Sequence, residues 1–237
     1  FYYLTGFNEP EAVAVLIPGR AEGEYVVFGR ERDRAAEQWT GIRAGTQGLK
    51  EQYGAHEAYP ISQLDELMPK LMANRQTVHY ALGADWAFDQ QVFKWLKTVR
   101  AQVRSGVSAP GHFVVLDQLI HEMRLIKSEQ ELAVMRHAAQ TSARAHTRAM
   151  QTCQAGLREY QIEAVLLHEF RSDGMELAYT SIVGGGKNAC ILHYIENQDV
   201  LQNGDLLLID AGAEYSNYAS DITRTFPVSG KFSPAQR

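Results

Sequence analysis

One segment near the end of the sequence constrains the fold most. Residues 206–226 read LLLIDAGAEYSNYASDITRTF, two apolar stretches rich in β-branched and aromatic residues around a short polar stretch. This pattern predicts two antiparallel strands joined by a tight turn. With a loop from Glu214 to Asn217, Asp210 lies directly opposite Asp221. Like charges there are destabilising, because the two Cβ atoms are only about 5 Å apart.

The two aspartates therefore need compensation, from a shared proton or from a bound cation. Successive side chains of a strand point to opposite faces, so both aspartates lie on the face opposite to Leu207 and Ile209. This arrangement favours an enclosed polar site. In the alternative interpretation, Asp210 is a turn residue at a strand end and Asp221 pairs with Arg224. Two carboxylates are also too few for a tight site, since hard divalent cations take about six ligands.

A glycine run precedes the next candidate residue, His193. Residues 182–194 read IVGGGKNACILHY, which we interpret as two short strands, 180–183 and 191–194, around glycines that let a ligand approach the backbone. The run matches no phosphate-binding pattern. His193 at the end of its strand is a candidate substrate-facing donor. The alternative is an ordinary core histidine.

Residues 1–117 alternate short apolar stretches with helix-length amphipathic ones. We expect strands at residues 13–17, 25–28, 78–82 and 113–116, and helices at residues 32–43, 62–74 and 85–104. Strands that alternate with helices indicate a layered α/β domain. A domain boundary is expected just after the last of these strands.

Residues 118–237 follow a different order. Ser128 and Glu131 form a capping-box pattern that predicts a helix of about 24 residues. A second helix is expected from Glu159 to Ser172, with Gly174 at its end. Strands follow, at 180–183, 191–194, 206–211 and 218–226. Helices followed by antiparallel strands indicate an α+β domain.

Composition narrows the function classes. The 237 residues carry 23 Lys and Arg against 28 Asp and Glu, a net charge of −5, which argues against a nucleic-acid partner. No apolar run approaches the ~20 residues that cross a bilayer, so no membrane association is expected. The two cysteines, Cys153 and Cys190, are too few for a disulfide framework, which favours a reducing, intracellular setting.

Four stretches together resemble a known family, the pita-bread metallopeptidases of family M24. They are LLLIDAG at 206–212, DITRTFP at 221–227, IVGGGKNACILHY at 182–194 and HEMRLIKS at 121–128. The first ten residues, FYYLTGFNEP, are similar to the N-terminal domain of the aminopeptidase P, or Xaa-Pro aminopeptidase, group. The resemblance implies an α/β N-terminal creatinase-like domain, residues 1–117, followed by the first half of an α+β pita-bread catalytic domain, residues 118–237.

The resemblance implies a cytoplasmic, manganese-dependent enzyme that releases the N-terminal residue of peptides with proline in second position. Family members hold two Mn²⁺ ions with two Asp, one His and two Glu, and a metal-bridging hydroxide attacks the scissile carbonyl. By motif, Asp210 would bind one metal and Asp221 would bridge both. His193 matches a catalytic histidine that contacts the substrate near the scissile bond.

Two further residues enter through the resemblance. Tyr179 lies where the family has a substrate-pocket tyrosine, and Trp39 looks like an aromatic residue that family members lend to a neighbouring subunit's active site. The family commonly forms homo-oligomers, either dimers or tetramers, through its N-terminal domain. The implied partners are therefore peptide substrates and further copies of the chain.

The family's remaining ligands, one His and two Glu, would follow Arg237. The sequence is therefore expected to be a fragment, also incomplete at its start, that is inactive alone. Three alternatives stay open: an Xaa-Pro dipeptidase (prolidase), which shares the ligand set; a metal-free creatine hydrolase, disfavoured by Asp210 and Asp221; and a non-catalytic peptide-binding module.

Overall fold

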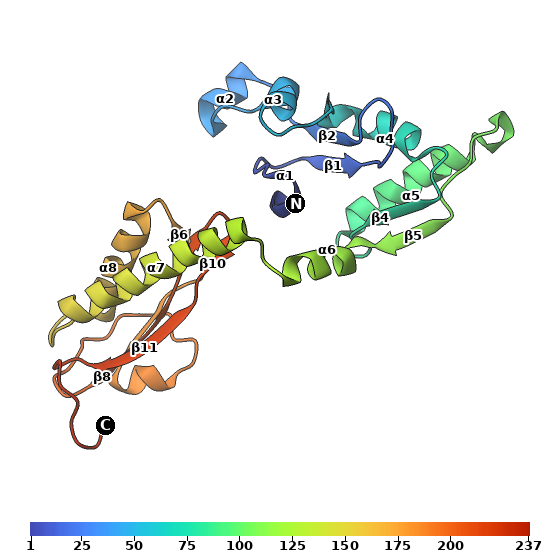
Figure 1. Cartoon of the computed structure of the whole chain (residues 1–237). Helices are drawn as coiled ribbons and strands as arrows, with labels where there is room; N and C mark the ends of the chain where they lie inside the picture. The colour runs from blue at the N-terminus through green and yellow to red at the C-terminus, as the bar shows by residue number, and fades with distance from the viewer. The chain divides into compact units, whose positions relative to one another are not determined.

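The computed structural model describes all 237 residues and divides them into two compact units, Phe1–Met123 and Arg124–Arg237 (Figure 1). Each unit has its own hydrophobic core. The division lies near the end of α6 (Leu116–Leu125), a helix that the sequence pattern did not indicate and that spans the expected boundary at residue 117. None of the helices combines the length and the hydropathy that crossing a bilayer would demand.

The first unit contains two small sheets. In one, β2 (Tyr25–Gly29) lies between β1 (Val13–Leu16), to which it is antiparallel, and β3 (Glu57–Pro60), to which it is parallel. In the other, β4 (Thr77–Tyr80) and β5 (His112–Val115) form a parallel pair. The expected α/β class is confirmed, although the sequence pattern missed β3.

Helices accompany these strands. They are α1 (Tyr2–Thr5), α2 (Arg34–Thr40), α3 (Gly45–Glu51), α4 (Leu64–Met72) and α5 (Trp86–Arg100), with short 3₁₀ turns η1 (Ile61–Gln63) and η2 (Val103–Ser105). The buried stripe of α5, which includes Trp95 and Val99, packs with Met68 of α4 and with β2 in one core. An amphipathic helix stabilises a sheet in this way by removing its apolar stripe from water.

Two long helices begin the second unit, and both match the prediction. In α7 (Glu129–Thr152), Ser128 Oγ accepts a hydrogen bond from the Glu131 amide (3.3 Å), and Glu131 Oε2 accepts from the Ser128 amide (2.7 Å). The capping box is therefore confirmed. The second helix, α8 (Glu159–Ser172), is followed by Gly174 with φ of 72°, a conformation that favours glycine at a helix end.

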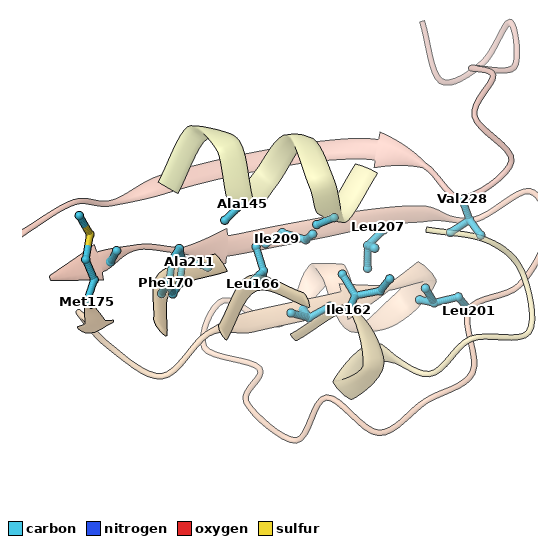
Figure 2. Close-up of a cluster of buried hydrophobic side chains, with 13 residues drawn as sticks. Ala145, Ile162, Leu166, Phe170, Met175, Leu201, Leu207, Ile209, Ala211 and Val228 are labelled. Carbon is cyan, nitrogen blue, oxygen red and sulfur yellow. The ribbon is translucent and has the colours of Figure 1, made fainter. Parts of the chain in front are cut away.

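The strands of the second unit form two antiparallel sheets. The larger has the order β11 (Ile222–Pro227), β8 (Leu206–Ala211), β7 (Ile182–Gly185). The smaller has the order β10 (Tyr218–Ala219), β9 (Ala213–Tyr215), β6 (Glu176–Leu177). Figure 2 shows side chains of α8 directed at β8, among them Ile162 and Leu166 near Leu207 and Ile209, all within one buried cluster. The opposite face of β8 carries Asp210.

The predicted register of the hairpin is wrong. The turn consists of Ser216 and Asn217 alone, both with positive φ (49° and 64°), as a two-residue type I′ turn requires. Consequently Asp210 lies opposite Thr223, and Asp221 lies diagonally from it. The predicted loop was too long because it counted two residues that pair within β9. The observed register differs from the predicted one by two residues. Because a shift by an even number of residues keeps each side chain on the same face of the sheet, both aspartates stay on the predicted face.

The predicted strand at 191–194 is also wrong. After β7 the chain forms the 3₁₀ turn η3 (Gly186–Cys190), and residues 191–193 form a turn that pairs with no strand. Gly186 has φ of 54°, which redirects the backbone at the end of β7. The apolar residues Ile191 and Leu192 are 54% and 84% exposed, so they do not form the buried strand that their hydrophobicity suggested.

Candidate metal centre

The structure brings three of the predicted site residues together. The Tyr179 hydroxyl lies 2.5 Å from Asp210 Oδ1 and 3.0 Å from Asp221 Oδ1, so one phenol bridges both carboxylates. Asp210 belongs to the central strand β8, whereas Asp221 precedes β11. The aspartates thus share one site, although they are not direct cross-strand partners.

A backbone contact explains how Tyr179 reaches this position. The Ala178 amide donates to the Gly212 carbonyl (2.9 Å), extending the pairing of β6 with β9 by one more hydrogen bond. Gly212 directly follows β8 and lies two residues after Asp210. The residue after Ala178 is therefore held beside the two carboxylates.

The Tyr179 hydroxyl supplies too few hydrogen-bond donors for the two carboxylates of Asp210 and Asp221. Burial, and then the hydrogen bonds to Asp210 and Asp221, raise the pKa of Tyr179 above its usual value, so the phenol keeps its proton. One hydroxyl has one hydrogen, and it can donate fully to only one carboxylate at a time. Most of the oxygen lone pairs of the two aspartates remain available for a further cation or donor.

The donor set fits a hard divalent cation, but only in part. Two carboxylates supply up to four oxygen ligands of the type that Mn²⁺ and Mg²⁺ prefer, while such ions take about six. Nowhere do three or more His, Cys, Asp or Glu side chains gather in a metal-binding cluster. Within the chain, Asp210 and Asp221 are thus the residues that could hold a metal here.

Buried polar groups brace the strands from the helix side. Nε2 of His146, on α7, donates to the Ala211 carbonyl (3.0 Å), and burial lowers the pKa of this histidine. The Ala213 amide donates to Ser142 Oγ (2.9 Å), which in turn lies 2.7 Å from Ser220 Oγ. Sequence patterns do not reveal these contacts, because the partners are remote from one another in sequence.

His193 lies on the turn after η3, and its side chain is exposed. It forms no hydrogen bond or ion pair within the chain, unlike its neighbour Tyr194, which is buried and donates to Glu159. The alternative of a core histidine is therefore wrong, because His193 and the two apolar residues before it, Ile191 and Leu192, are exposed.

Trp39 belongs to the first unit, near the end of α2, and is 88% exposed. The nearby Ile42 is 82% exposed. Both side chains are therefore almost entirely exposed in their own unit. They are available for contact with another surface.

Comparison with known families matches both units. Residues 1–80 match the aminopeptidase P N-terminal domain, and residues 133–237 match metallopeptidase family M24. The second unit thus resembles metallopeptidase family M24 over most of its length. The chain has the predicted combination of an N-terminal creatinase-like domain and part of a pita-bread domain.

The chain is similar to several proteins that are named Xaa-Pro aminopeptidase. It is 45% identical to an Xaa-Pro aminopeptidase of Escherichia coli over 100% of the chain and 54% of that protein. It is 34% identical to human Xaa-Pro aminopeptidase 3, over 100% of the chain and 47% of that protein. The solved structure of aminopeptidase PepP from Pseudomonas aeruginosa superposes with a TM-score of 0.96 and 56% identity, over 100% of the chain and 54% of that structure. The chain thus spans about half the length of the relatives it matches.

Proposed function

We propose that this chain carries part of the active site of a metal-dependent aminopeptidase that releases the N-terminal residue of peptides with proline in second position. The pair of carboxylates bridged by Tyr179 carries this proposal, because it is the arrangement that needs a cation and offers it oxygen ligands. The names of the relatives support the choice of reaction.

Asp210 and Asp221 would hold the metal, which we propose to be Mn²⁺, two ions per complete site. A bound divalent ion supplies activation of a water nucleophile and polarisation of the scissile carbonyl. A zinc-substituted form of the E. coli enzyme has been solved, so the identity of the ion needs its own test. No His, Cys or Glu side chain joins the two aspartates in a metal-binding cluster, and we propose that the chain alone does not hydrolyse peptides.

The remaining site residues would act on the peptide. His193, exposed and free of internal partners, is proposed to contact the substrate near the scissile bond. Tyr179 is proposed to border the substrate pocket while its hydroxyl holds the two carboxylates. Trp39, exposed in the first unit, is proposed to contribute to the site of a neighbouring subunit in a homodimer or homotetramer.

A cytoplasmic location is part of the proposal. Both cysteines, Cys153 and Cys190, are free thiols in the structure, which suits a reducing compartment.

Calorimetry with Mn²⁺ on the 237-residue chain tests the metal site. We expect weak binding that is lost in Asp210→Asn and in Asp221→Asn. Asp205→Asn is the matched control, because its carboxylate belongs to the same unit but forms no side-chain hydrogen bond or ion pair. Equal binding by all variants would show that the ion binds elsewhere. Tight binding of two ions would show that the chain needs no further ligands.

Hydrolysis assays test the reaction. An Xaa-Pro-Xaa tripeptide and an Xaa-Pro dipeptide, offered side by side with Mn²⁺, separate an aminopeptidase from a dipeptidase. We expect no turnover of either by the chain alone. Turnover comparable to that of an intact relative would refute the proposed inactivity, and a preference for the dipeptide would favour a prolidase.

A further inference from the structure

A fully buried carboxylate lies at the first residue of α8. Glu159 is 0% exposed, and both of its oxygens accept two hydrogen bonds. Oε1 accepts from the Gly185 amide (2.8 Å) and from Asn188 Nδ2 (3.1 Å). Oε2 accepts from the Tyr194 hydroxyl (2.7 Å) and from the Asp199 amide (2.9 Å).

All four donors come from one stretch of chain, residues 185–199. This stretch starts at the last residue of β7 and otherwise contains only η3 and irregular backbone. Irregular backbone cannot satisfy its amides through a regular ladder, so buried groups within it need side-chain partners. Glu159 meets that need at the beginning, in the middle and at the end of the stretch.

His193 lies inside the anchored stretch. Asn188 is fixed five residues before it, and Tyr194 directly after it. Asn188 Nδ2 also donates to Asp199 Oδ2 (2.9 Å), which links the residues on the two sides of His193 to each other. The turn that bears the exposed imidazole is thereby held at both sides, although the imidazole itself has no partner.

A second buried side chain supports the same stretch independently. Asn197 is 1% exposed; its Oδ1 accepts from the Val183 amide (3.0 Å), and its Nδ2 donates to the Ser181 carbonyl (2.9 Å). Glu163, one helical turn after Glu159, accepts from the same Asn197 Nδ2 (3.0 Å). Glu163 thus touches the stretch once, at a group with another partner, whereas Glu159 touches it four times.

We propose that Glu159 is a positioning residue that fixes the His193 turn for contact with the peptide substrate. The inference rests on the proposed function, in which His193 faces the substrate. Glu159 touches neither carboxylate of the metal centre. In this proposal, it controls the position of His193 instead. Glu159 acts only through the backbone and side chains it anchors.

Glu159→Gln tests this in the full 237-residue chain, with Glu163→Gln as the matched control on the same helix. The amide of Gln keeps the shape but replaces one acceptor oxygen by an NH₂ group, which meets donors instead of accepting from them. We expect hydrogen exchange of the Gly185 and Asp199 amides to rise at least about tenfold in Glu159→Gln, with much less change in Glu163→Gln. The imidazole NMR signal of His193, assigned with His193→Gln, should shift in Glu159→Gln but not in Glu163→Gln.

Tyr194→Phe keeps the proposal testable if Glu159→Gln unfolds. It removes a single donor next to His193 and should still shift the imidazole signal. An unchanged His193 signal in Tyr194→Phe, or equal effects of Glu159→Gln and Glu163→Gln, would overturn the positioning role. These measurements need neither metal nor peptide, so they remain decisive if the proposed function fails its own tests of Mn²⁺ binding and hydrolysis.

Discussion

Gly212 lies against the backbone of Ser220 with no space for a side chain: a Cβ atom on Gly212 would lie 1.7 Å from the Ser220 carbonyl oxygen. The two backbones approach closely because the Ser220 amide donates to the Ala213 carbonyl (2.9 Å). This close approach lies where β8 gives way to β9, between Asp210 and Asp221 along the hairpin. The absence of one Cβ therefore permits the bend that brings the carboxylates together.

Gly212→Ala should destabilise the second unit by at least about 2 kcal/mol, because backbone atoms must move to admit the methyl group. Urea unfolding followed by circular dichroism measures this loss. Gly111→Ala is the control, since a Cβ there meets nothing within 4 Å and Gly111 has no positive φ. Similar unfolding midpoints for the two variants would contradict the close approach.

Tyr179→Phe should lower the free energy of unfolding at neutral pH by about 1 kcal/mol, because the carboxylates of Asp210 and Asp221 lose their shared donor. Thermal unfolding without added metal gives the size of the effect. Tyr215→Phe serves for comparison, because its hydroxyl forms no hydrogen bond while its ring packs edge-on against His137. If both variants lose the same stability, the bridging hydroxyl has no special role.

The first unit should show a pH-dependent contribution from Asp65. The hydrogen bond from Trp95 Nε1 (2.7 Å) is the main cause that lowers the pKa of Asp65. A lowered folded-state pKa gives stability that is present above the unfolded value of 3.8 and is lost as pH falls through the folded value. Asp65→Asn should therefore be less stable than the original chain at pH 5–7, and the difference should shrink below about pH 4.

Unfolding curves of Asp65→Asn and the original chain, recorded by tryptophan fluorescence at several pH values, measure this difference in stability, since Trp95 is buried. A stability difference that grew on acidification would show that the sign is wrong. If the stability difference were the same at pH 3 as at pH 7, Asp65 would stabilise the fold only through contacts that do not depend on its charge.

Trp39→Ala should leave the unfolding free energy within about 0.5 kcal/mol, because an 88% exposed side chain contributes little packing. If Trp39 reaches a neighbouring subunit, the same change should weaken self-association in sedimentation velocity. Trp86→Ala is a suitable control, as Trp86 is also exposed, at 72%, in the same unit. Equal sedimentation of both variants and the original chain would argue against that role.

The helices of the second unit could be predicted closely, because their signals are local. Ser128 and Glu131 lie within one turn and define the start of α7, and Gly174 defines the end of α8. The face of β8 was equally clear, since alternating apolar residues determine which side of a strand is buried. That alternation predicted the face on which Asp210 lies, and the even spacing across the hairpin predicted the same face for Asp221.

The exact pairing could not be predicted in the same way. The loop length depends on whether Glu214 and Tyr215 pair across strands or form the turn, and both residues suit either place. The role of Glu159 was also hidden, because a Glu at the start of a helix is usually a solvated residue. Only the three-dimensional fold brings residues 185–199 to that carboxylate.

The anchoring of this stretch also bears on how the chain tolerates lengthening. Loops without regular structure are ordinarily the places where insertions and protease cuts do least harm. An added residue beside the buried donors, such as one between Gly185 and Asn188, would however displace a donor from Glu159 and leave an unsatisfied group in the interior. In evolution or engineering, these anchored positions should therefore behave like a core strand, and length changes belong at exposed turns such as the one at Gly230.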